Sequence, residues 1–231
     1  MSNRVLVVAA HPDDEILGCG GAMARHVKAG DHVSLAILAE GLTSRDSQRD
    51  RERRREEISE LGKAARQANK ILGVTDVELY DFPDNRMDSV PRLDIVKQVE
   101  NLVDRFRPNI LYTHHSGDVN IDHRCIHEAV VTACRPMPGN HQVDTLLFFE
   151  VASSTEWQTA GSAPPFHPNW YLDISETLGL KKQALEAYQS EMRPWPHARS
   201  IKAVAHLAHW RGAGIGVEAA EAFILGRRIV G

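Results

Sequence analysis

Short apolar runs rich in β-branched residues alternate with longer segments of helical character along the chain. We expect strands at 5–10, 33–39, 77–80, 109–113, 145–151 and 170–174, and helices at 14–28, 51–72, 92–106, 126–133, 175–190, 200–210 and 217–225. Strands that alternate with helices favour right-handed crossovers and a parallel sheet covered on both faces. The sequence therefore predicts a three-layer α/β/α sandwich with a mostly parallel, Rossmann-like sheet.

The size and composition fit one globular domain. A chain of 231 residues is expected to form a single domain, 1–231, with a core at about 4–151 and a C-terminal third, 152–231, that adds a substrate-side loop and helices. The net charge of -4 gives no general attraction to nucleic acid or to an anionic membrane. Three cysteines without a CxxC pair, no signal-like segment and no long apolar run predict a soluble cytoplasmic protein.

The first predicted strand ends abruptly in His-Pro-Asp-Asp-Glu, residues 11–15. Helix capping is one interpretation, since an acid at the start of a helix is favourable, but it explains only one or two of these side chains. Adjacent carboxylates repel each other unless a cation lies between them. Imidazole mixed with carboxylate suits Zn²⁺ better than Ca²⁺ or Mg²⁺, so a metal site is favoured over capping alone.

A second polar cluster, THHSGDVNIDHRCIH, follows the strand predicted at 109–113. The carboxyl ends of parallel strands meet at one edge of a sheet, so the two clusters are expected to lie close together. We expect at least one ligand among His114, His115 and His123. Asp122 is placed to orient the neighbouring imidazole of His123 from outside the metal's coordination sphere.

Glycines 18, 20 and 21 lie close behind the first strand, where a nucleotide-binding loop is one alternative. They do not form the GxGxxG pattern, and they lie one turn inside the predicted helix rather than in the turn before it. Close packing of this helix on the sheet is the favoured interpretation.

The strand that ends in His-Pro-Asp-Asp-Glu and the later Asp-His that opens a helix resemble the zinc-dependent de-N-acetylases. This LmbE-like, or PIG-L, family includes the deacetylases of N-acetylglucosaminyl-phosphatidylinositol, mycothiol and bacillithiol synthesis, and the resemblance covers about residues 4–135. It implies a catalytic Zn²⁺, with Fe²⁺ or Co²⁺ as other possible ions. The implied roles are His11, Asp14 and His123 as metal ligands, Asp13 as general base, and Arg54, Asp84 and His114 as substrate contacts.

The second motif departs from the family pattern at one position. Many relatives have His-Pro-Asp-His, whereas this chain has Asn-Ile-Asp-His at 120–123. Asn120 can donate a hydrogen bond to an oxyanion, but it cannot deliver a proton at neutral pH. The general acid is then sought among His114, His115 and His197, and His197 is favoured because the Pro-rich segment RPWPHARS is suited to a rigid loop.

The resulting hypothesis is a hydrolase that removes the N-acetyl group from an N-acetylated amino sugar, whether free, glycosidic or nucleotide-linked, with a homo-oligomer as a possible assembly. The alternatives are an amidase for a non-sugar amide or thiol conjugate, and a domain that binds metal or ligand without turnover. The run RDRERRREE, 49–57, favours a solvated face of paired charges, and a contact with a substrate phosphate is the second interpretation. Trp195 could stack on a sugar ring.

Overall fold

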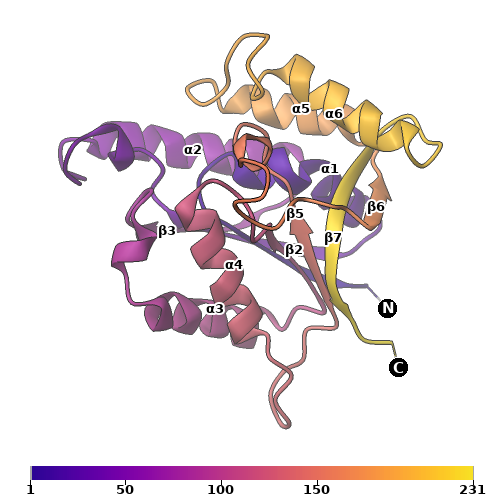
Figure 1. Cartoon of the computed structure of the whole chain (residues 1–231), viewed down its shortest axis with the longest axis horizontal. Helices are drawn as coiled ribbons and strands as arrows, with labels where there is room; N and C mark the ends of the chain where they lie inside the picture. The colour runs from indigo at the N-terminus through magenta and orange to yellow at the C-terminus, as the bar shows by residue number, and fades with distance from the viewer. Residues whose placement is uncertain (1, 231) are drawn as a thin grey trace.

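The computed structural model describes residues 2–230 and contains one seven-stranded sheet (Figure 1). The strand order is β3-β2-β1-β4-β5-β7-β6. The first five strands run parallel to one another, and β7 runs antiparallel to both of its neighbours. The strands are β1 (Arg4–Ala9), β2 (His32–Ala39), β3 (Asp76–Phe82), β4 (Ile110–His114), β5 (Thr145–Phe149), β6 (Trp170–Asp173) and β7 (Ala220–Arg228).

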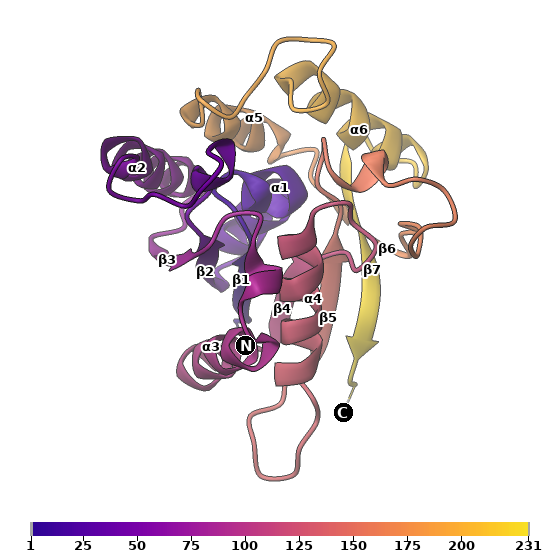
Figure 2. The same ribbon diagram turned by 60° about the vertical axis from the view of Figure 1, so that its left-hand side comes forward.

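Helices cover both faces of this sheet, which confirms the three-layer prediction (Figures 1 and 2). One layer contains α1 (Asp14–Lys28), α2 (Arg55–Ile71), α5 (Leu178–Ala187) and α6 (Ile201–Ala213), and the other contains α3 (Arg92–Phe106) and α4 (Ile121–Ala133). Alternate residues of β1 supply the two cores, because Val5 and Val7 pack under the first layer and Leu6 and Val8 under the second. None of the helices in 2–230 is long and apolar enough to cross a bilayer.

The helix predicted at 217–225 is wrong, because most of this segment belongs to the strand β7, which begins at Ala220. The segment is mostly small and apolar, with Glu218 and Glu221 interspersed. Ala220–Phe223 are buried between β5 and β6, and the strand completes the sheet. The requirement of β5 and β6 for a hydrogen-bonded partner overrides local helix preference. The remaining predicted elements are present. The helices predicted at 14–28 and 92–106 match at both ends, and the others have shifted ends; the helix predicted at 126–133, for example, begins at Ile121.

The glycines of α1 serve close packing, as predicted. A methyl group on Gly18 would overlap the ring of Phe149, and one on Gly21 would lie 2.8 Å from Ile174. The helix also breaks at Cys19, where φ is -146° and ψ is 22°. The break exposes backbone groups within α1, and buried charged side chains bind them: Glu221 accepts from the N–H of Gly21 and of Ala22, and Lys181 donates to the carbonyl of Leu17.

Candidate active site

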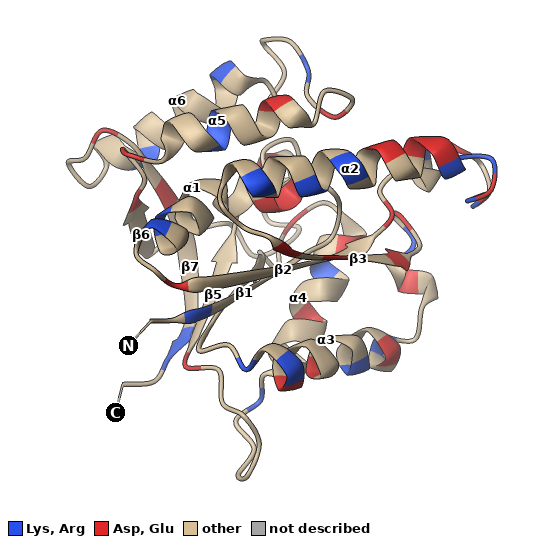
Figure 3. Cartoon of the chain, turned by 180° about the vertical axis from the view of Figure 1, so that it is seen from behind, with Lys and Arg blue, Asp and Glu red and all other residues tan. Residues whose placement is uncertain are grey.

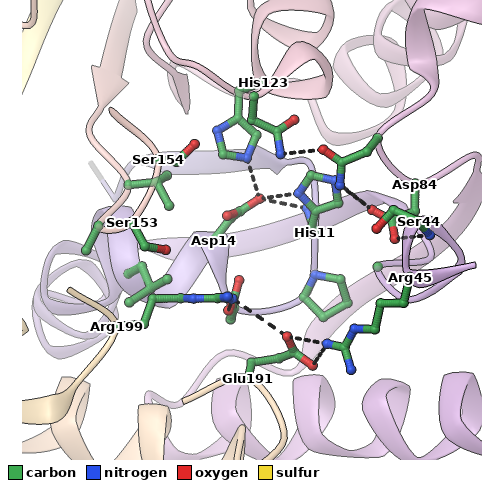
Figure 4. A pocket seen from close by; sticks show the side chains of 18 residues that line it. His11, Asp14, Ser44, Arg45, Asp84, His123, Ser153, Ser154, Glu191 and Arg199 are labelled. Atoms are coloured by element: carbon green, nitrogen blue, oxygen red, sulfur yellow. Dashed lines mark hydrogen bonds and ion pairs between the residues drawn. The ribbon is translucent and has the colours of Figure 1, made fainter. Parts of the chain in front are cut away.

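A cavity of about 200 Å³ opens at the carboxyl edge of the sheet. It collects segments that are distant in sequence: the turn between β1 and α1, residues 41–45 after β2, residues 84–85 after β3, the start of α4, residues 151–154 after β5, and the segment between α5 and α6. Figure 4 shows these side chains pointing toward one another. The position agrees with the rule that open α/β sheets bind ligands at this edge.

The turn after β1 holds its residues in an unusual conformation. Asp13 has φ 111° and ψ -30°, a backbone conformation that residues other than glycine rarely adopt. Its side chain makes no capping hydrogen bond to α1. The turn is closed by the His11 N–H, which donates to Asp14 Oδ2 at 2.8 Å, and by the Asp13 N–H, which donates to Glu15 at 3.1 Å. Such strain concentrates at functional sites, and here Asp13 is not used to cap the helix.

Three ligand atoms converge beside Asp13. His11 Nδ1 and His123 Nε2 each lie 3.1 Å from the same oxygen of Asp14, Oδ2. The three groups fall within 4.8 Å of one another, as a metal site requires. Tetrahedral bonds of about 2.0–2.2 Å separate neighbouring ligand atoms by roughly 3.4 Å, so this donor set fits a zinc-like ion.

Carboxylates lie behind both imidazoles. His11 Nε2 is 3.0 Å from Asp122 and 3.3 Å from Asp84, and His123 Nδ1 is 3.2 Å from Asp118. The expected contact of Asp122 with His123 is therefore wrong, since Asp122 contacts His11 and also accepts backbone N–H groups. Metal-ligating histidines commonly place a carboxylate at the second nitrogen, so this arrangement adds to the fit.

The charges of the three converging groups are strongly coupled. Burial alone would lower the pKa of both imidazoles, but hydrogen bonds to Asp122 and Asp14 raise the pKa of His11 well above its usual value. The attraction of Asp14 and Asp118 raises the pKa of His123 to about 9. Burial would raise the pKa of Asp14, but His123 and His11 hold it well below its ordinary value. Because the carboxylates retain protons on the imidazoles, a divalent cation can take the place of those protons.

Asp13 is nearly fully buried beside this cluster. Burial and the charge of Asp14 raise the pKa of its carboxyl well above its ordinary value, and Arg199 partly opposes the shift. Arg199 Nη1 lies 3.2 Å from Asp13 and 3.6 Å from Glu191, and Arg45 donates to both oxygens of Glu191. These contacts place a protonatable carboxyl next to the three converging groups.

Asn120 lines the cavity and also begins α4. Its side-chain oxygen accepts the N–H of Asp122 at 2.9 Å, which is an ordinary helix cap, and its Nδ2 donates to Asn85 at 2.9 Å. Asn120, which replaces the histidine of the family motif, thus has a structural role as the cap of α4.

Several predicted site residues do not line the cavity. His197 accepts the backbone N–H of Arg199 and packs its ring on Trp157, and Arg54 is bound to Asp46 and Glu57. His114 is fully buried, accepts the N–H of Ala10 at 2.8 Å and stacks on His123 at 3.9 Å. Burial lowers the pKa of His114 well below its usual value, so the ring is neutral. The catalytic or substrate roles predicted for these three residues remain untested predictions.

Four charged residues of the site were not singled out from the sequence: Asp118, which lies behind His123, and Arg45, Glu191 and Arg199, which line the cavity. Asp118 carried a usable signal, because it lies in the polar cluster after β4 with the spacing Asp-x-Asn-x-Asp-His. Arg199 lies two residues after His197, so the Pro-rich segment was identified but the wrong side chain was chosen. Arg45 and Glu191 gave no local signal.

The comparisons with known proteins agree with this geometry. Residues 6–134, more than half of the chain, match the family model described as "PIG-L: GlcNAc-PI de-N-acetylase". The chain belongs to this family. Both polar clusters of the site fall within the matched range.

Two curated relatives are deacetylases by name. The uncharacterized deacetylase YaiS of Escherichia coli K12 is 32% identical over 141 residues, which cover 58% of this chain and 69% of that protein. The probable N-acetyl-alpha-D-glucosaminyl L-malate deacetylase 2 of Bacillus cereus is 26% identical over 193 residues, 83% of this chain and 84% of that protein.

Solved structures share the whole fold. The conserved protein TT1542 of Thermus thermophilus has a TM-score of 0.76 at 25% identity, with 99% of this chain and 97% of that chain covered. The 4-carboxy-2-hydroxymuconate hydratase GalB of Pseudomonas putida KT2440 also has a TM-score of 0.76, at 21% identity, with 98% and 97% covered. Because that protein is named a hydratase, the fold alone does not specify the reaction.

Proposed function

We propose that this protein is a metal-dependent hydrolase that removes the N-acetyl group from an N-acetylated amino sugar. The observation that carries the proposal is the convergence of His11, Asp14 and His123 on one side of the cavity, with the protonatable carboxyl of Asp13 beside them. Membership of the de-N-acetylase family and a relative named for an N-acetylglucosaminyl substrate support the choice of substrate.

His11, Asp14 and His123 would hold the ion, and Asp122 and Asp118 would orient the two imidazoles. When bound, a divalent ion supplies a Lewis acid that polarises the amide carbonyl and makes water easier to deprotonate. Mixed imidazole and carboxylate ligands suit Zn²⁺, and they also accept Fe²⁺ or Co²⁺.

Asp13 is the group that moves the proton in this proposal. It accepts a proton from the water that attacks the amide carbon, and it returns that proton to the nitrogen as the C–N bond breaks, which yields acetate and a free amine. A raised pKa suits both directions of transfer. The sequence favoured His197 as the acid, but the cavity lining contains Asp13 and not His197.

The direct test is metal content and amine release in the purified protein and its variants. Asp13→Asn is expected to retain bound metal and lose roughly a hundredfold or more of the hydrolysis rate, because the amide cannot accept the proton. His11→Ala is expected to lose the metal itself, measured by elemental analysis. Asp104→Asn, at an exposed position of α3, is the matched control and should change neither property.

Assays with a panel of candidate substrates distinguish this function from the alternatives. It contains free and glycosidic N-acetyl sugars, and both acetate and amine are assayed. Release from none of them would overturn the proposal and favour an amidase for a non-sugar amide or a non-catalytic binding domain. A cytoplasmic location and a homo-oligomer remain predictions from the sequence.

A further inference from the structure

Glu15 is a buried acid to which the proposed reaction assigns no role. Its exposed fraction is 0%, it does not line the cavity, and it directly follows Asp14. A carboxyl group that is removed from water needs hydrogen-bond partners to offset the loss of its hydration. The partners of Glu15 therefore indicate what its side chain does.

Three donors from different segments of the chain meet at the Glu15 carboxyl group. Oε2 accepts the backbone N–H of Asp13 at 3.1 Å. Oε1 accepts the hydroxyl proton of Tyr188 at 2.6 Å and the side-chain N–H of Asn69 at 2.8 Å. The group thus connects the turn after β1 with α2 and with the residue that follows α5.

The side chains that hold Glu15 belong to the packed core. Tyr188 and Asn69 both have an exposed fraction of 0%. The helices α2 and α5 pack against each other on the same face of the sheet as α1 (Figure 3). Asn69 also donates to the carbonyl of Ala65 in its own helix at 2.9 Å, which fixes the direction of its amide. Glu15 is therefore held from behind, independently of the cavity.

The hydrogen bond from Glu15 acts on the strained residue of the turn. Asp13 has φ 111°, and such a conformation persists only where the surrounding structure enforces it. The carbonyl of Asp13 accepts the N–H groups of Ile16 and Leu17, at 3.1 and 2.9 Å, so α1 holds one side of its Cα atom. Glu15 holds the N–H on the other side. The two contacts together set φ, and with it the direction in which the Asp13 side chain leaves the backbone.

We propose that Glu15 is a positioning residue, which directs the Asp13 carboxyl group into the cavity by holding the Asp13 N–H. The inference rests on the proposed function, in which Asp13 moves the proton. Arg199 contacts the Asp13 carboxyl group itself at 3.2 Å, whereas Glu15 acts on the backbone behind it. Proton transfer requires heavy atoms about 2.6–3.2 Å apart, so a small rotation of the turn is enough to slow the reaction.

The first test is the variant Glu15→Gln. An amide has an acceptor at only one of its two ends, so either the Asp13 N–H or the donors behind Glu15 lose their acceptor. We expect kcat to fall about tenfold or more, while KM and the affinity for the metal each change less than about threefold, because the proposed ligands are unchanged. A loss of metal affinity that accounts for the whole loss of activity would overturn the inference.

The variant Tyr188→Phe tests the support behind Glu15, and it serves in place of Glu15→Gln if that protein does not fold. It removes one donor and keeps the ring in the core, so kcat should fall severalfold at unchanged KM. Tyr112→Phe is the matched control, because Tyr112 is 1% exposed and its hydroxyl pairs with His26, outside the turn, at 2.9 Å. The same kcat in the two folded variants would contradict the inference.

The Asp13→Asn background separates positioning from a general loss of structure. If Glu15 acts through Asp13, adding Glu15→Gln to Asp13→Asn lowers the residual rate far less than it lowers the wild-type rate, because residues that act as a unit are not additive. The same fold-loss in both backgrounds would mean that Glu15 has only a structural role.

A crystal structure of Glu15→Gln tests the inference without turnover. The Asp13 carboxyl group is expected to turn away from the cavity or to adopt more than one position. An Asp13 residue that keeps its conformation and its single position would refute the positioning role. A full rate in Asp13→Asn, by contrast, would contradict the proposed function and not the contact between Glu15 and the turn.

Discussion

Asp118 is the residue whose role follows most directly from its contacts. It is fully buried, faces His123 Nδ1, and accepts hydrogen bonds from the hydroxyls of Ser154 and Thr155. Burial alone would raise the pKa of Asp118, but the charge of His123 and these hydrogen bonds lower it, so the carboxylate stays ionised. It therefore fixes both the orientation and the basicity of the imidazole.

Asp118→Asn is expected to weaken metal binding by about ten- to hundredfold, the usual effect of removing a carboxylate behind a ligating histidine. Competition with a chromogenic chelator measures the affinity without any need for turnover. Asp94→Asn, at an exposed position of α3, serves as the control. Unchanged affinity in a folded Asp118→Asn protein would show that the contact is only structural.

His127 provides a pH-dependent prediction outside the candidate site. Burial lowers its pKa below the usual 6.5, and its Nδ1–H donates to the carbonyl of His114. The folded protein thus binds this proton less tightly than the unfolded chain, so stability falls as the pH drops below about 6.5. His127→Asn keeps a donor but cannot titrate, and its urea midpoint should fall less between pH 7 and pH 5. His167→Asn, at an exposed position, should retain the wild-type slope.

The residue-level predictions from sequence were limited by distance along the chain. Residues 11–15 could be recognised from the sequence, because four polar side chains among five residues cannot all be explained by a helix start. Glu191 and Arg199, by contrast, reach the site only through the folding of the segment between α5 and α6. No local pattern distinguishes their side chains from ordinary surface charges.

At the scale of elements, α1 depends on its glycines for its distance from the sheet. Gly18→Ala would force the ring of Phe149 to move, and overpacking of this kind costs about 1–3 kcal/mol. Gly179→Ala is the matched control, because no atom lies within 4 Å of its added methyl group and alanine favours a helix. Chemical denaturation should show destabilisation in the first variant and none in the second. Equal stability of the two variants would contradict the packing role.

The helices and strands were predictable where the hydrophobic pattern of the sequence matches the burial of the element in the fold. The parallel strands β1 and β2 are mostly apolar and are buried after their first residue, because both of their faces are covered. Residues 217–225 were predicted wrongly, because alanines and glutamates at helical spacing do not show that the segment pairs with two strands of the sheet. Within this strand Glu221 is buried, and it accepts hydrogen bonds from the N–H groups of Gly21 and Ala22 beside the break in α1.

At the scale of the whole molecule, the pair of Lys181 and Glu221 connects three elements. Their charged atoms lie 2.6 Å apart, almost fully buried, and together they bind backbone groups on both sides of the break in α1. The pair therefore holds the helix that begins at the candidate site against α5 and β7.

Lys181→Met leaves Glu221 buried without its cation and is expected to destabilise the protein by about 3–5 kcal/mol. The double variant Lys181→Met/Glu221→Gln removes both charges and should recover part of that loss. Urea unfolding followed by tryptophan fluorescence measures both. A single variant within about 1 kcal/mol of the wild-type stability would show that the pair contributes little.

The last strand along the described chain, β7, does not lie at the edge of the sheet. In the described chain β6 joins the sheet only through β7. β6 therefore has no strand partner until residues 220–228 are in place. During synthesis, β1 to β5 and both polar clusters emerge well before this closing strand. We therefore expect β6 to take its place in the sheet only after residues 220–228 have paired with β5, so the strand that comes last in the described chain completes the fold.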